Sequence, residues 1–87
     1  MIYPTGTITI EELQSVKLPV VNFAEGYKVA EVDVFLGKCV DTLRNGYGLS
    51  AEEVERHSFT STYMGGYAIG DVDLLLDRIA WTLKNRP

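Results

Sequence analysis

The chain has 87 residues, of which 46% are hydrophobic and 23% are charged. A chain this short buries only roughly 60–65% of the surface that its unfolded form exposes, so we expect its parts to fold together or with a second copy. Twelve acidic and eight basic residues give a net charge of −4, which argues against a nucleic-acid partner because phosphate binding needs clustered Lys and Arg.

The first predicted elements are a short helix and an extended segment. Thr9 and Glu12 have the spacing of a capping box, in which a hydroxyl and a carboxylate bond the free amides of a helix start. Residues 18–23 are rich in β-branched and aromatic side chains, which are typical of extended structure. A Gly-Tyr turn at residues 26–27 is expected to follow.

A longer helix is predicted over about 29–44. It should end at Gly46, because glycine adopts the left-handed conformation of a helix cap without strain. One face of this helix is apolar at helical spacing, and its residues are Val32, Phe35, Leu36, Cys39 and Leu43.

The same order of elements recurs in the second half of the chain. Ser50 and Glu53 form a second capping box, residues 59–63 a second extended segment, and a second long helix is expected over about 69–85. Its apolar face consists of Val72, Leu75, Leu76, Ile79 and Leu83.

An internal repeat therefore organises the chain. Residues 26–43 match residues 66–83 at seven of eighteen positions, and the units span about 9–45 and 50–85. The repeated motif consists of Gly26, Tyr27, Val32 and Asp33, and of Gly66, Tyr67, Val72 and Asp73.

The short link between the two units predicts a single domain over residues 1–87. We expect a mainly α fold, a small α+β body, in which two repeats of short helix, extended segment, Gly-Tyr turn and longer helix pack together. The extended segments would be marginal alone, and they can pair within one chain or between two.

The residues predict neither catalysis nor a metal site, and no cofactor is expected. His57 is the only histidine, and without a second ligand at metal-binding spacing it is expected to be structural or exposed. Asp33 and Asp73 lack a basic partner three or four positions away, so we expect each to accept hydrogen bonds from the backbone of a neighbouring segment. A polar contact to a partner and acid–base chemistry are the alternatives for these two aspartates.

The second long helix carries an additional apolar stripe. Leu74 and Trp81 lie seven residues apart with Arg78 between them, and a helix that is apolar on two sides needs two packing partners. Tryptophan and arginine are typical of interface centres, so these three residues form a candidate interface and a homodimer is favoured. The alternative is that Trp81 closes the core of a small domain.

The single cysteine and the absence of long apolar runs indicate a cytoplasmic protein. Cys39 excludes an internal disulfide, and its apolar helical surroundings are typical of a buried thiol in a reducing compartment. The sequence shows neither the roughly 18–20 apolar residues of a membrane span nor a secretory signal over residues 1–9.

The repeated motifs resemble the DivIVA-type domain, present here in two tandem copies. The resemblance rests on residues 23–27 followed by 31–36, and on Phe59 followed by 65–67 and 71–76. It covers the chain from Thr9 to about Leu83. DivIVA-type proteins are bacterial cell-division and polar-growth scaffolds, which contact the membrane and self-associate through coiled coils. The resemblance implies a non-enzymatic interaction or scaffold module that binds itself and other cell-division proteins.

The resemblance also implies an alternative function as a peripheral, curvature-sensing membrane protein at the inner face of the membrane or the division site. In the family, a turn phenylalanine backed by a basic residue enters the membrane. Phe23 matches that phenylalanine, and Tyr63 and Met64 stand at the equivalent place of the second unit. The chain departs from the family because Ala24 and Glu25 follow Phe23 and no heptad pattern extends the helices.

Overall fold

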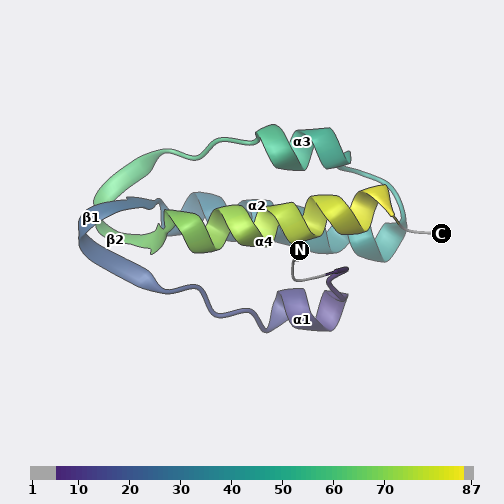
Figure 1. Ribbon diagram of the computed structural model, residues 1–87, viewed down its shortest axis with the longest axis horizontal. Helices are drawn as coiled ribbons and strands as arrows, with labels where there is room; N and C mark the ends of the chain where they lie inside the picture. The colour runs from purple at the N-terminus through teal and green to yellow at the C-terminus, as the bar shows by residue number, and fades with distance from the viewer. Residues whose placement is uncertain (1–5, 86–87) are drawn as a thin grey trace.

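The computed structural model describes residues 6–85 (Figure 1). Residues 1–5 and 86–87 of the predicted domain lie outside this described part. The element order is α1 (Ile10–Gln14), β1 (Val20–Tyr27), α2 (Val29–Asn45), α3 (Ala51–Arg56), β2 (Ser61–Ala68) and α4 (Ile69–Lys84). The order helix, strand, helix thus occurs twice.

The predicted mainly α fold class is wrong. Over the described residues, the protein is an α+β globule of four helices and a two-stranded antiparallel sheet, about 55% helical and 20% strand. The cause is local, because the Gly-Tyr pairs at 26–27 and 66–67 lie inside eight-residue strands and not in turns between strand and helix. Each strand is therefore longer than the segment of β-branched and aromatic residues from which it was predicted.

Both predicted capping boxes are confirmed at the starts of α1 and α3. The Thr9 hydroxyl accepts a hydrogen bond from the Glu12 amide at 3.0 Å, and the Glu12 carboxylate accepts one from the Thr9 amide at 3.0 Å. The corresponding distances for Ser50 and Glu53 are 3.1 and 2.7 Å. Each short helix thus has two of its free amides satisfied by its own first turn.

The two long helices also agree with the sequence pattern. The predicted ranges of about 29–44 and 69–85 correspond to α2 and α4. The Gly46 cap of α2 has a φ of 85°, in the left-handed region, as predicted. In Figure 1, α4 lies in front of α2, both begin at the sheet and run away from it, and α1 and α3 lie on opposite sides of them.

The core is one apolar cluster to which both repeats contribute. Most residues of the two predicted apolar faces belong to it, and Leu36, Leu43 and Leu83 pack against it while partly buried. The buried residues are Ile8, Leu13, Val32, Phe35, Cys39, Ala51, Val54, Val72, Leu75, Leu76, Ile79 and Ala80. Neither repeat encloses this cluster alone.

The sheet consists of two bent strands at one end of the molecule (Figure 1). The first half of β1 pairs with the second half of β2, and the second half of β1 pairs with the first half of β2. In both halves the residue numbers of β1 rise as those of β2 fall, so the two strands run antiparallel. The facing pairs are Val20–Tyr67, Val21–Gly66, Asn22–Met64, Gly26–Thr62 and Tyr27–Ser61, and at the end of β1 Gly26 and Tyr27 also face Ala68 and Tyr67. The extended segments thus pair within one chain.

The two strands cross at Gly26 and Gly66, both of which are buried. A Cβ atom on Gly26 would lie 2.8 Å from the Tyr67 carbonyl oxygen and 2.9 Å from the Gly66 carbonyl carbon. A Cβ atom on Gly66 would lie 2.8 Å from the Tyr27 carbonyl oxygen and 2.9 Å from the Gly26 carbonyl carbon. Side-chain carbons do not approach backbone this closely, so only glycine fits at either position.

We expect Gly26→Ala to lower the free energy of unfolding by about 1–3 kcal/mol or to prevent folding. The added methyl group would collide with backbone that can move only by separating the strands. The matched control is Gly37→Ala in α2, where a Cβ atom meets nothing within 4 Å, and it should raise the stability by about 0.5–1 kcal/mol. Urea unfolding followed by circular dichroism measures the stability of both variants. Equal changes in the free energy of unfolding would contradict the close crossing of the two strands at Gly26.

Candidate functional site

The repeated Tyr and Asp residues connect the two repeats to each other. The Tyr27 hydroxyl donates to Asp73 Oδ1 at 3.0 Å, and the Tyr67 hydroxyl donates to Asp33 Oδ1 at 2.8 Å. The predicted backbone donors for the two aspartates are therefore wrong. Because the strands cross, each tyrosine reaches the long helix of the other repeat, and a side-chain hydroxyl takes the place of the expected amide.

Burial and these hydrogen bonds together raise the pKa of both tyrosines above the ordinary value of 10.0. Burial, followed by the hydrogen bond to Asp73, raises the pKa of Tyr27. For Tyr67 the hydrogen bond to Asp33 is the larger cause and burial the smaller one. The neighbouring motif residues Val32 and Val72 are fully buried. The repeated motif thus forms a structural connection between the repeats.

His57 belongs to an aromatic cluster and not to a group of metal ligands. Its ring stacks on Phe35 with the centroids 3.9 Å apart, and it meets the edge of Phe59 at 4.7 Å. Within residues 6–85, no three His, Cys, Asp or Glu side chains are grouped so that they could hold a metal ion. His57 is exposed and makes aromatic contacts, and both observations fall within the expectation that it is structural or exposed.

The predicted interface residues lie on and beside the outer surface of α4. Leu74 and Trp81 are 56% and 53% exposed, so Trp81 does not close the core. A groove of about 490 Å³ runs past them. It is lined by Gly6, Glu55, Leu74, Leu75, Asp77, Arg78, Trp81 and Lys84. We call Leu74, Asp77, Arg78 and Trp81 the α4 face.

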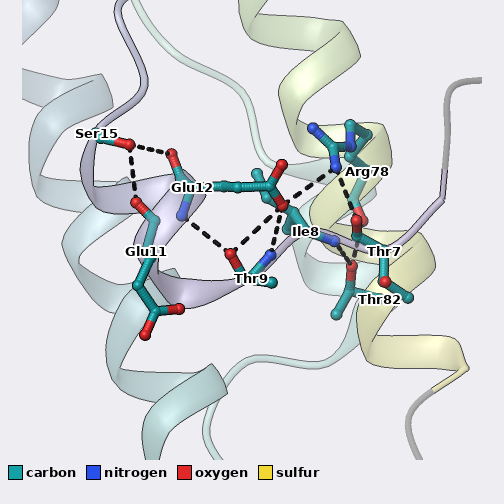
Figure 2. A network of polar contacts seen from close by, with 8 residues as sticks. All are labelled: Thr7, Ile8, Thr9, Glu11, Glu12, Ser15, Arg78 and Thr82. Carbon is teal, nitrogen blue, oxygen red and sulfur yellow. Dashed lines mark hydrogen bonds and ion pairs between the residues drawn. The ribbon is translucent and has the colours of Figure 1, made fainter.

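Arg78 also has a structural role, which its position in the apolar stripe does not predict. Figure 2 shows its guanidinium between α4 and the segment that leads into α1. Its Nη2 atom donates to the Thr7 carbonyl oxygen at 2.7 Å and lies 3.5 Å from Glu12 Oε1. Nearby, the Ile8 amide donates to the Thr82 hydroxyl at 2.8 Å. Arg78 therefore holds the first repeat against α4 at the edge of the groove.

Two further acidic residues line the groove, and the sequence pattern did not single them out. Glu55 forms an ion pair with Lys84 at 3.0 Å across the groove edge. Asp77 is exposed, and it has no hydrogen bond or ion pair within the described part of the chain. Comparison of the two repeats could have indicated Asp77, because the first unit has an uncharged residue, Gly37, at the equivalent position.

A second apolar surface lies where the strands bend. Phe23, Met64 and Tyr63 are 94%, 83% and 61% exposed. Asn22, next to Phe23, lies opposite Met64 in the sheet, so the three side chains occupy the same end of the molecule. We call these three residues the tip.

The backbone at the tip is bent sharply. Phe23 has a φ of 64°, in the left-handed region that non-glycine residues rarely adopt. In the second unit the positive φ falls on Gly65, at 75°, two positions beyond Tyr63, which is the residue equivalent to Phe23 in the repeat. The structure thus holds an aromatic side chain on a strained, exposed bend where a glycine would be favoured.

No protein-family model, curated protein or solved structure matches this chain. None of the helices within residues 6–85 has the length and hydropathy that crossing a membrane requires.

We expect Tyr27→Phe to lower the free energy of unfolding by about 0.5–1 kcal/mol near pH 7, because it removes the hydrogen bond to Asp73 and keeps the ring. The raised pKa means that folding favours the neutral phenol. The stabilisation should therefore be complete below pH 10 and disappear as the pH rises through the raised pKa.

Guanidinium unfolding at pH 7 and above pH 10 tests this expectation. The difference between Tyr27→Phe and the parent protein should shrink at the higher pH. Tyr47→Phe is the control, because Tyr47 is 75% exposed and makes no hydrogen bond within the described residues. A loss that is independent of pH would contradict a role for the phenol proton.

Proposed function

We propose that this protein is a small non-enzymatic interaction module that resembles DivIVA-type cell-division scaffolds and self-associates through its long helices. The observation that carries the proposal is the exposed apolar pair Leu74 and Trp81 in a groove on α4. Covering the exposed halves of these two side chains would contribute about 2–3 kcal/mol to association. Aromatic anchors in a groove with charged edges are typical of protein interfaces.

The hydrogen bonds of Asp33 and Asp73 support a non-enzymatic function. These are the two carboxylates considered for acid–base chemistry, and each holds a tyrosine hydroxyl of the other repeat. Their arrangement explains why the motif occurs twice, since each copy needs its counterpart.

The family resemblance adds the cellular context to the proposal. The protein acts in the cytoplasm, at the division site, and other cell-division proteins are partners besides a second copy of the chain. The absence of a predicted coiled coil is consistent with a short helical contact on α4 as the means of association.

The tip supports a second candidate function, contact with a membrane surface. Its three exposed apolar side chains lie at one end of the molecule, and Phe23 stays there despite its strained backbone. Glu25 is exposed in the same bend and would repel anionic lipids. Insertion through the tip would therefore depend on apolar burial and favour loosely packed, curved bilayers.

We expect Trp81→Glu to abolish self-association, because it places a charge at the centre of the α4 face. Sedimentation equilibrium at roughly 10 µM to 1 mM should show a reversible dimer for the parent protein and a monomer for the variant. Tyr47→Glu makes the same change at an exposed aromatic residue away from α4 and should leave the dimer intact. A parent protein that is monomeric at all concentrations would refute the proposal.

For the second candidate, we expect Phe23→Gly to abolish sedimentation with small, curved vesicles of neutral lipid. The same change should raise the stability of the protein by about 1 kcal/mol, because glycine adopts a positive φ without strain. Tyr47→Gly is the control for the loss of an exposed ring. Equal sedimentation of the parent protein and Phe23→Gly would exclude the tip as a membrane contact.

A further inference from the structure

Charged residues of opposite sign stand on the two sides of the apolar line of α4. With 3.6 residues per turn, Leu74 and Trp81 lie almost on one line along the helix, Asp77 about 50° to one side and Arg78 about 50° to the other. The line runs along the middle of the exposed surface of α4, because the residues on the opposite side are buried in the core. A second helix on this line would therefore contact an acidic and a basic edge at once.

Both charged groups can make a further contact. The contacts of Arg78 with Thr7 and Glu12 use Nη2 alone, which leaves the N–H groups of Nη1 as donors. Asp77 is exposed and has no partner within the described part of the chain. In contrast, Lys84 is already paired with Glu55.

The orientation of a symmetric pair of α4 helices decides which charges meet. In a parallel pair, the two-fold axis runs along the helices, so the Arg78 edge of one copy faces the Asp77 edge of the other. Leu74 then meets Leu74, and Trp81 meets Trp81. Two contacts between opposite charges flank this apolar centre.

An antiparallel pair that keeps both apolar residues in contact has its two-fold axis between residues 77 and 78. Leu74 then faces Trp81 of the other copy, but like edges face each other. Arg78 stands beside Arg78, and Asp77 stands beside Asp77. Like charges at close range disfavour this arrangement.

We infer that the α4 face binds the α4 face of a second copy in a parallel arrangement, with Leu74 and Trp81 at the centre and Asp77 paired with Arg78 on both sides. The inference rests on the proposed self-association and specifies its geometry. A contact along one helix of about 24 Å is smaller than a standard interface. The dimer is therefore reversible, with dissociation in the micromolar range.

Disulfide trapping tests the orientation. Gly70 and Asn85 are exposed and lie one turn before Leu74 and one turn after Trp81, about 22 Å apart along the helix axis. A Cβ atom on Gly70 meets nothing within 4 Å. Burial raises the pKa of Cys39 to about 12, so the native thiol does not compete.

The experiment mixes Gly70→Cys with Asn85→Cys, one of them carrying a mass tag, and identifies the disulfides after mild oxidation. Parallel pairing gives 70–70 and 85–85 disulfides, with mixed 70–85 products making up less than about a tenth of the total. Predominantly mixed disulfides would overturn the inference while leaving self-association intact. Gly37→Cys on α2, where a Cβ atom also meets nothing within 4 Å, is the matched control and should give no disulfide.

A charge variant tests the edges independently. Asp77→Asn should raise the dissociation constant of the dimer about three- to tenfold, because two exposed ion pairs are lost. Asp41→Asn on α2 makes the same change of charge away from the α4 face and controls for net charge. An unchanged or lower dissociation constant for Asp77→Asn would overturn the inference. A parent protein that is monomeric would instead refute the proposed self-association itself, and the α4 face would then bind a different partner.

Discussion

The close approach of two backbones at Gly26 and Gly66 is the constraint on which the rest of the structure depends. Because no side chain separates the strands at this point, each strand passes over the other and enters the long helix on the far side. The crossing brings each tyrosine of the motif to the aspartate of the other repeat. It also makes the two long helices begin together and run in the same direction from the sheet (Figure 1). The repeated Gly-Tyr and Val-Asp pairs are therefore parts of one reciprocal arrangement.

The two repeats are alike in the core and different on the surface. The motif residues of both units are buried or engaged with the opposite unit, so the fold needs both copies of the motif. The outer surfaces have no such constraint, and the second unit alone carries Trp81, where the first has Asp41. The proposed self-association thus uses the side of the molecule on which the two repeats differ. This agrees with the common finding that a scaffold fixes the shape while a few exposed residues provide the function.

Much of the fold could be predicted because it is encoded locally. Capping boxes, the Gly46 cap and the apolar faces of α2 and α4 depend on residues within a few positions of each other, and the structure confirms them. The length of the strands, the crossing and the donors to Asp33 and Asp73 depend on contacts between segments about forty residues apart, and no local pattern specifies those contacts.

On the α4 surface, Leu74 and Trp81 could be found from helical spacing alone. The contacts of Arg78 with Thr7 and Glu12 could not, because they join opposite ends of the chain.

The bent strands have a consequence for how the chain acquires its structure. Each half of the sheet consists of one segment from each repeat, so residues 20–27 have no strand partner until residues 61–68 have been synthesised. Pairing of strands this far apart in the sequence is slow, because the intervening loop must close before any strand pairing stabilises it. A fragment that contains one repeat would expose both an unpaired strand edge and half of the apolar core. Both the sheet and the apolar core are therefore complete only when the two units are present together.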